Sequence, residues 1–432
     1  MGDKTGNQCE RRNALNGWSS VMICSRGGET MDEWPKFPWI QNPPLRHSHV
    51  VDSSEIGSEE GLRYKFFAPY STESPTCPQL ITSKMSVQRN PKDSMKSTWR
   101  TQDRGQWSLQ HWFYEIFDIH PTSLDKDVPV HQKSEKVPYL PEWQQHRWII
   151  THALLPLLIH HIYTSYTGNN LTALGAVLFY SVAFKLTAIH ELHVLRRVGH
   201  QYGFFDGDVH ERDGVPDVSV AKVAHSLLST STFRPIFTVF LAYRASKPPS
   251  TINWYWLPLE VGLYGIILDF WFYWYHRLMH EVGGLWKYHR THHLTKHPNP
   301  LLTLYADLEQ EFFDIAGIPL MTYFSMKLMG LPMGFYEWWI CHMYVVWVEL
   351  AGHSGLRIVA IPPNTLSWAL RLLNAELIIE DHDLHHRYGW KTSANYGKQT
   401  RLWDRLFGTC RDRIECQASN IDYENTVSLP WI

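Results

Sequence analysis

Apolar residues are distributed unevenly along the chain. Residues 1–84 are rich in Ser, Gly, Pro and charged residues and show no sustained period of 2 or 3.6. After residue 147, long apolar runs alternate with polar segments, and several approach the roughly 20 apolar residues that a membrane-spanning helix needs. The pattern predicts a disordered or dispensable N-terminal extension, followed by an all-α integral membrane protein.

Six apolar runs predict three transmembrane helical hairpins. The run at 229–243 is the weakest, because it contains Arg234 and Pro235, and it is compatible with either a span or a re-entrant segment. The polar residues 194–225 predict a loop before this run. The six runs are 148–163, 171–189, 229–243, 253–275, 312–329 and 334–350.

Changes in composition divide the chain into four parts. After the extension at 1–84, residues 85–147 combine aromatic, basic and proline residues, which favours a membrane-proximal cytosolic segment. A membrane-embedded domain is expected at 148–410 and a C-terminal tail at 411–432. One hypothesis is that the working protein begins at Met85.

Eight histidines are concentrated in three short motifs. The motifs are HRLMH at 276–280, HRTHH at 289–293 and HDLHH at 382–386. On a helix, residues three and four apart share a face, so each motif directs several imidazoles to one side. The candidate ligands are His276, His280, His289, His292, His293, His382, His385 and His386.

These motifs predict a centre with two metal ions. Imidazole without cysteine suits iron, copper, zinc or nickel, whereas magnesium and calcium prefer oxygen ligands. Eight histidines are too many for one tetrahedral zinc site. The pairs His160 with His161 and His190 with His193 lie on largely apolar segments outside the ordered motifs, and we interpret them as packing residues.

The order of the motifs also constrains the membrane topology. The second and third motifs can share a site only if the chain between them crosses the bilayer an even number of times, which a hairpin does. Basic residues cluster beside both motifs, and the positive-inside rule places such clusters in the cytosol. We therefore expect a cytosolic metal site above the hairpins.

The overall composition agrees with a membrane protein in a reducing compartment. The chain has 20 Trp, 21 Tyr and 19 Phe, and aromatic residues are enriched at membrane interfaces. The formal net charge of −2 gives no indication of a nucleic-acid surface. The six cysteines show no CxxC spacing and are interpreted as free thiols. No cleavable signal peptide is expected.

The ordered motifs, with apolar hairpins between them, resemble the fatty acid hydroxylase or sterol desaturase superfamily of integral-membrane non-haem di-iron oxygenases. The resemblance covers roughly residues 150–410. It implies two iron ions, O2 as co-substrate, and electrons from a separate donor such as cytochrome b5 or a similar reductase system. It also implies hydroxylation or desaturation of a bilayer lipid, sterol-like or fatty-acyl/sphingoid, in lipid biosynthesis, with endoplasmic reticulum localisation. The segment after the second motif matches no substrate branch closely.

The superfamily uses a further histidine between the second and third motifs. His353 is preferred, because it lies in an HSG segment similar to that of sterol-oxidising members, and His342 and His297 are the alternatives. Carboxylates that hold the other ring nitrogen orient metal-binding histidines. Asp269, Asp381 and Asp383 are the candidates for this role.

Two other classes of protein were weighed. A membrane zinc protease requires HExxH, but His280 and Glu281 are followed by Gly284 where the second histidine should be. A non-catalytic metal-binding or transport protein would place ligands along a path inside the spans. The motifs here lie at predicted helix ends beside basic residues, which favours an enzyme and leaves the binding protein as the alternative.

Overall fold

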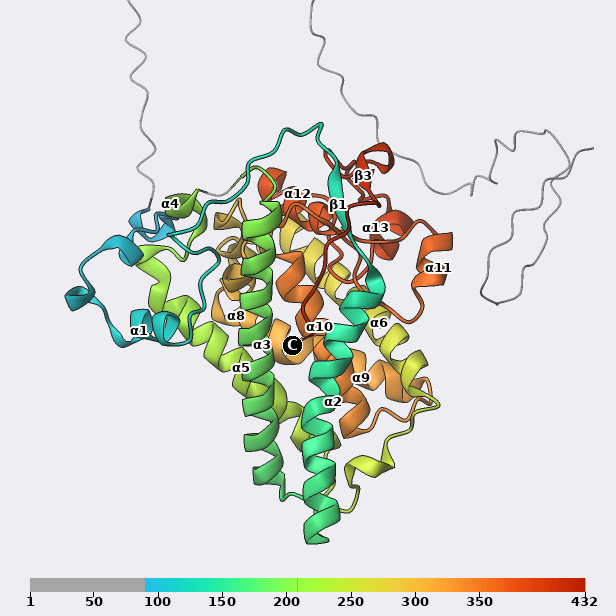
Figure 1. Cartoon of the computed structure of the whole chain (residues 1–432). Coiled ribbons are helices and arrows are strands. Elements are labelled where there is room, and N and C mark those ends of the chain that lie inside the picture. The colour runs from blue at the N-terminus through green and yellow to red at the C-terminus, as the bar shows by residue number, and fades with distance from the viewer. Residues whose placement is uncertain (1–89, 208, 432) are drawn as a thin grey trace, which may run out of the picture. The chain divides into compact units, whose positions relative to one another are not determined.

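The computed structural model describes residues 90–207 and 209–431. The predictions for residues 1–84 and for a start at Met85 lie outside these residues. The described part is mostly helical, which confirms the predicted helical character, whereas the transmembrane hairpins stay a prediction (Figure 1). The α-helices are α1 Leu109–Ile116, α2 Glu142–Thr167, α3 Ala173–Tyr202, α4 His210–Asp213, α5 Val220–Ala242, α6 Leu257–Glu281, α7 Trp286–His289, α8 Leu308–Phe312, α9 Ile318–Leu328, α10 Phe335–Gly352, α11 Ser367–Leu372, α12 Ile379–Tyr388 and α13 Leu402–Phe407.

Shorter elements connect these helices. The strands are β1 Val137–Leu140, β2 Val359–Ala360 and β3 Ile421–Asp422. The 3₁₀ turns are η1 Pro91–Asp93, η2 Trp99–Thr101, η3 Arg104–Gln106, η4 Asp217–Ser219, η5 Pro249–Thr251, η6 His292–Leu294, η7 Pro300–Leu304 and η9 Ala418–Asn420, and η8 Phe313–Gly317 is a π-turn.

Helices α2 and α3 form an antiparallel pair that reaches the end of the structure opposite α12 (Figure 1). Gly168 ends α2 with a left-handed φ of 69°, a conformation that costs glycine little. The Thr172 hydroxyl accepts a hydrogen bond from the Gly175 N–H and so caps the start of α3. The elements of the first predicted hairpin are therefore present.

Helix α10 lies at the centre of the helical packing. All its residues except Gly352 are buried, and α2, α3, α5 and α6 pack around it. A helix that is apolar all round must be buried on every side. The predicted run at 334–350 thus forms the core helix of the molecule, and its C-terminal end leads directly to His353.

The loop predicted at residues 194–225 is shorter in the structure. Helix α3 continues to Tyr202, because Val194, Leu195 and Val198 form a buried face. The Arg196 guanidinium points away from this face and pairs with Asp118. The prediction of a loop from 194 is wrong, because a buried apolar stripe on one face outweighs charged residues on the other.

Helix α5 runs without interruption through Arg234 and Pro235. Among the residues that the structure describes, α3 is the one helix that is long and apolar enough to cross a membrane. The other predicted spans are shorter or contain more charged and polar residues than such a helix usually carries. The number of membrane crossings therefore stays a prediction.

A small parallel sheet joins distant parts of the chain. Strand β1 lies between β2 and β3, with Tyr139 opposite Val359 and Val137 opposite Ile421. The Val427 N–H donates to the Tyr139 carbonyl. The described C-terminal segment, residues 411–431, is thereby packed against the segment that precedes α2.

Candidate metal centre

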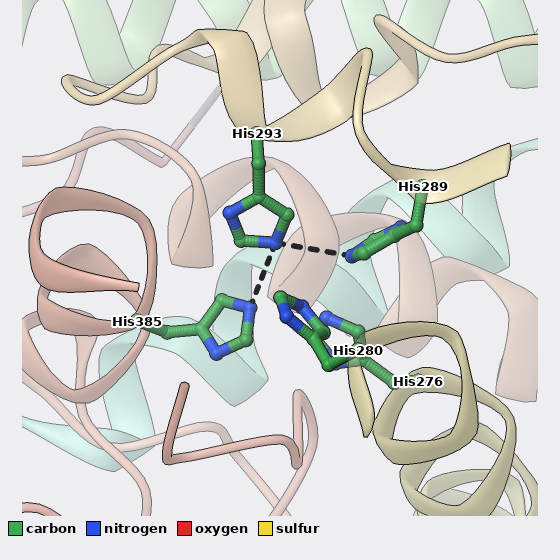
Figure 2. A group of neighbouring side chains, drawn as sticks. All are labelled: His276, His280, His289, His293 and His385. Carbon is green, nitrogen blue, oxygen red and sulfur yellow. Dashed lines mark hydrogen bonds between the residues drawn. The ribbon is translucent and has the colours of Figure 1, made fainter. Parts of the chain in front are cut away.

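The structure gathers nine histidines into two adjacent buried groups. Within each group, the facing nitrogen atoms lie within 4.8 Å of one another. Figure 2 shows the rings of the larger group pointing toward a common centre. The five-histidine group consists of His276, His280, His289, His293 and His385, and the four-histidine group consists of His292, His353, His382 and His386.

Three helix ends supply the motif histidines. His276 and His280 lie one turn apart at the C-terminal end of α6, as expected from HxxxH. The second motif forms α7 and η6, two single turns joined by residues with helical backbone angles, rather than one regular helix. The third motif lies on α12. His353 follows the last residue of α10.

The doubled histidines separate into different groups. His293 belongs to the five-histidine group, whereas its neighbour His292 belongs to the four-histidine group, and His385 and His386 divide in the same way. Adjacent residues on a helix point about 100° apart, so an HH pair can direct one imidazole to each of two sites. The ring centroids of His293 and His386 are 4.7 Å apart, so the two groups are neighbours.

The closest nitrogen pairs have the spacing of neighbouring metal ligands. The Nε2 atom of His293 lies 3.0 Å from that of His289 and 3.1 Å from that of His385. In the other group, the Nε2 atoms of His382 and His353 are 2.9 Å apart. Two nitrogens bound at about 2.1 Å and at right angles are about 3.0 Å apart, so the residues present fit metal ions.

The loop after α12 orients three rings of the five-histidine group through its carbonyl oxygens. The Nδ1 of His276 lies 2.8 Å from the Tyr396 carbonyl. The Nδ1 of His280 is 2.7 Å from the Trp390 carbonyl, and that of His385 is 2.7 Å from the Ala394 carbonyl. An Nδ1–H bonded in this way leaves the Nε2 lone pair free for a metal.

Other elements orient three further rings. The Nδ1 of His289 is 2.9 Å from Oε1 of Gln310. In the four-histidine group, His353 contacts the Glu349 carbonyl at 2.9 Å, and His386 contacts the Thr295 carbonyl at 3.2 Å. Main-chain carbonyls and one amide thus perform the role expected of carboxylates.

The expectation that Asp269, Asp381 and Asp383 hold ring nitrogens is therefore corrected. Asp269 instead accepts hydrogen bonds from the N–H groups of residues 398–400 at 2.7, 2.9 and 3.2 Å and from the Thr400 hydroxyl at 2.8 Å. It fastens the histidine-orienting loop to α6. The other two carboxylates lie on α12 and pair with arginines, Asp381 with Arg413 and Asp383 with Arg387.

Two carboxylates that support the site were not predicted from the sequence. Asp404 accepts hydrogen bonds from the Tyr396 and Gly397 N–H groups and so holds the loop from its other side. Glu380 accepts the N–H groups of residues 414–416 and attaches the C-terminal segment to α12. For both carboxylates, the one signal in the sequence was an acidic residue near the histidine motifs. Their hydrogen-bond partners are main-chain N–H groups of other segments, which no residue type marks.

Burial keeps the imidazoles neutral. Desolvation lowers the pKa of His289 and of His385 to about 3, and neighbouring imidazoles act in the same direction. A neutral imidazole presents the lone pair that a metal requires. At neutral pH, the centre is therefore a set of uncharged nitrogen ligands.

The remaining candidate histidines lie outside both groups. His342 is buried in α10 against Tyr264 and Trp338. His297 lies beside Asp206. The two pairs interpreted as packing residues also lie apart from the centre, since the ring of His160 contacts Tyr180 and His190 contacts His152.

Two adjacent clusters of buried imidazoles define the class of site, a histidine-rich site that could hold metal ions. The family model for fatty acid hydroxylase matches residues 261–409, which include all nine histidines. The chain belongs to the fatty acid hydroxylase superfamily, and the resemblance stated from the motifs is confirmed.

Several curated relatives agree with this assignment. A fatty acid hydroxylase, vlmA, of Lecanicillium sp is 44% identical over 316 residues, which cover 70% of this chain and 86% of the relative. An alkylglycerol monooxygenase of Xenopus tropicalis is 28% identical over 39% of this chain and 33% of the relative. A Delta(7)-sterol-C5(6)-desaturase of Nicotiana tabacum is 28% identical over 40% of this chain and 57% of its own. No solved structure matches the chain.

Proposed function

We propose that this protein is an O2-dependent di-iron oxidoreductase that hydroxylates or desaturates an unactivated C–H position of a membrane lipid. The observation that carries the proposal is the pair of adjacent, buried, all-imidazole groups. The nine histidines would hold two iron ions, five residues at one and four at the other. The ions would supply the activation of O2, which amino-acid side chains cannot perform.

The overall reaction requires electrons and protons from outside the chain. Hydroxylation consumes the C–H bond, one O2, two electrons and two protons, and yields an alcohol and one water. Desaturation removes two hydrogens from neighbouring carbons with the same reductant and yields two waters. A separate donor, cytochrome b5 or a similar reductase system, supplies the electrons in this proposal.

Exposed apolar side chains support delivery of the substrate from a bilayer. The free faces of α2 and α3 carry large apolar residues that are about half exposed or more, among them Leu155, Leu158, Leu178 and Leu186. A surface of this kind marks contact with a membrane or a partner. We place the metal centre on the cytosolic side of the endoplasmic reticulum membrane and the α2–α3 turn across it.

Metal analysis and product analysis together test the proposal. The full chain is purified from membranes, its iron and zinc are measured, and lipids of cells with and without the chain are profiled under oxygen and under nitrogen. Two irons per chain and a lipid that gains an oxygen or a double bond only with O2 are expected. Two tightly bound metals with no change in any lipid would instead favour the metal-binding or transport alternative.

A further inference from the structure

A small, partly open pocket, here called the chamber, lies one helical turn from the four-histidine group. Its volume is about 60 Å³, and it lies between α3, α5, α10 and η7. Glu349 of α10 lines it, and the main-chain carbonyl of the same residue contacts His353 Nδ1. Four residues of helix rise by about 6 Å, so the chamber is close to the metal centre.

The chamber walls are apolar, yet several polar atoms beside it have no partner. Thr230 and Arg234 line the chamber from α5, and the Thr230 hydroxyl and the Arg234 Nε find no hydrogen-bond partner among the described residues. The side chains are 5% and 3% exposed. Buried polar groups are nearly always hydrogen-bonded, so unpaired ones require an explanation.

Glu191 adds a third unpaired group. It is fully buried, and neither of its carboxyl oxygens has a hydrogen-bond partner within the part of the chain that the structure describes. Glu191 is not itself a lining residue, but Ala188, one turn before it on α3, and Leu192, the next residue, line the chamber, and its carboxyl group interacts electrostatically with Glu349. A buried carboxyl without a partner is costly.

The charges nearby are already compensated. Oε1 of Glu349 lies 3.0 Å from Nζ of Lys398, and Oε2 lies 3.5 Å from Nη1 of Arg234. The Arg234 Nη2 also donates to the Asp314 carbonyl at 3.0 Å. The unpaired Glu191, Thr230 and Arg234 Nε therefore require hydrogen bonds rather than a further counter-charge.

From this arrangement we infer that the chamber binds a hydroxyl or amide group of the lipid substrate. Such a group both donates and accepts, so it can accept from Arg234 Nε and the Thr230 hydroxyl in the lining, and Glu191, buried next to the lining residues Ala188 and Leu192, would be its acceptor. A water molecule requires roughly 10–15 Å³ of such space, so the chamber accommodates one polar group and an adjacent carbon. The oxidised carbon would then lie a few carbon atoms from that oxygen or nitrogen function. This inference rests on the proposed function and specifies the substrate class.

Binding of defined lipids tests the inference without turnover. The full chain in phosphatidylcholine nanodiscs is mixed with hexadecan-1-ol, hexadecanamide, hexadecanoate or hexadecane, and the unfolding temperature is measured. The alcohol or the amide should raise the unfolding temperature more than hexadecane does. Glu191→Leu and Thr230→Val should each abolish this excess. The matched control is Thr322→Val, because the buried Thr322 hydroxyl is already bonded to the Ile318 carbonyl.

The inference also predicts the unfolding temperatures of Glu191→Leu and Thr230→Val without added lipid. Removing an unpaired buried polar group relieves its desolvation cost, so both variants should unfold at or above the temperature of the parent protein. A lower unfolding temperature in both would show that ordered water already satisfies these groups, and would overturn the inference. Two further results would overturn the inference. In the first, both variants keep the full rise in unfolding temperature that the alcohol or the amide gives relative to hexadecane. In the second, only hexadecanoate gives such a rise.

Failure of the inference is distinguishable from failure of the proposed function. The binding measurement is repeated in His385→Ala, in which turnover should be lost. An excess that persists there would support the chamber independently of turnover, and only the absence of lipid oxidation by the parent protein would count against the enzyme. If the parent protein oxidises a lipid and substitution of Glu191 or Thr230 does not change this oxidation, the proposed function stands and the proposed role of the chamber is refuted.

Discussion

The two histidine groups are supported in different ways. In the five-histidine group, one loop orients His276, His280 and His385 through its carbonyl oxygens. In the four-histidine group, His353 depends on the end of the buried helix α10, and His386 depends on Thr295. Three rings of one site are held by a single segment, whereas the rings of the other are held by separate elements, so mutations in that segment should affect the two metals unequally.

Removing a histidine from one group gives the largest expected effect. His385→Ala should lower the bound metal from two ions to about one per chain and abolish turnover, because it removes a ligand nitrogen that lies 3.1 Å from the Nε2 atom of His293 in the five-histidine group. His382→Ala should do the same to the other ion. Metal analysis of the purified proteins measures the loss.

The control for these variants is His342→Gln, which alters a buried histidine outside both groups and should retain both metals. Loss of both ions in each single variant would show that the two groups do not act as separate sites. Full turnover in either variant would exclude the centre itself.

Asp269→Ala should come next in size and should act on one group. Without its carboxylate, the N–H groups of residues 398–400 lose their acceptor and the orienting loop loosens. Loss of such supporting contacts typically weakens metal binding 10- to 100-fold. Competition with a chelator should show one metal weakened and the other retained.

Glu281→Gln is the matched control, since Glu281 lies on the same helix and pairs with Arg277 at the surface. Equal weakening of both metals in Asp269→Ala would contradict the difference between the groups, and so would equal binding in the variant and the parent protein.

Gln310→Leu should have the smallest effect of the three. It removes the acceptor of His289 Nδ1 and leaves the loop in place. The weakening is expected near the lower limit of the range for such contacts, about tenfold for one metal. Gln399→Leu is the control, because the Gln399 side chain bonds to no histidine in the described structure. If Gln310→Leu weakens metal binding as much as Asp269→Ala does, the loop stabilises the site no more than a single side chain does.

Much of the site could be predicted because its signal is local. HxxxH and HxxHH spacings follow from helix geometry alone, so His276, His280 and the two triplets were recognised as a group. The alternation of apolar and polar segments indicates where the long helices lie but not all of their ends, since α2 begins at Glu142 and α3 continues to Tyr202. His353 was selected over His342 and His297 by resemblance, and the structure brings it to the four-histidine group.

The supporting contacts could not be predicted in the same way. The acceptors of the ring nitrogens are main-chain carbonyls, which every residue has, so no residue type marks them. The position of Asp269 near the first motif marks it as a candidate, but its predicted role was wrong, because its partners are main-chain groups about 130 positions further along the chain. The role of α10 as the core also depends on which helices surround it, since an apolar run is compatible with either a span or a core helix.

The sequence by itself determined the donor chemistry, the helical class and the superfamily, because spacing and residue type are local properties. Only the tertiary structure decided how the nine histidines divide into five and four, which carbonyls orient them, and where unpaired polar groups remain beside the centre. These features arise from contacts between segments far apart in the chain. Their energies depend on distance, burial and the direction of each donor, none of which the order of residues contains.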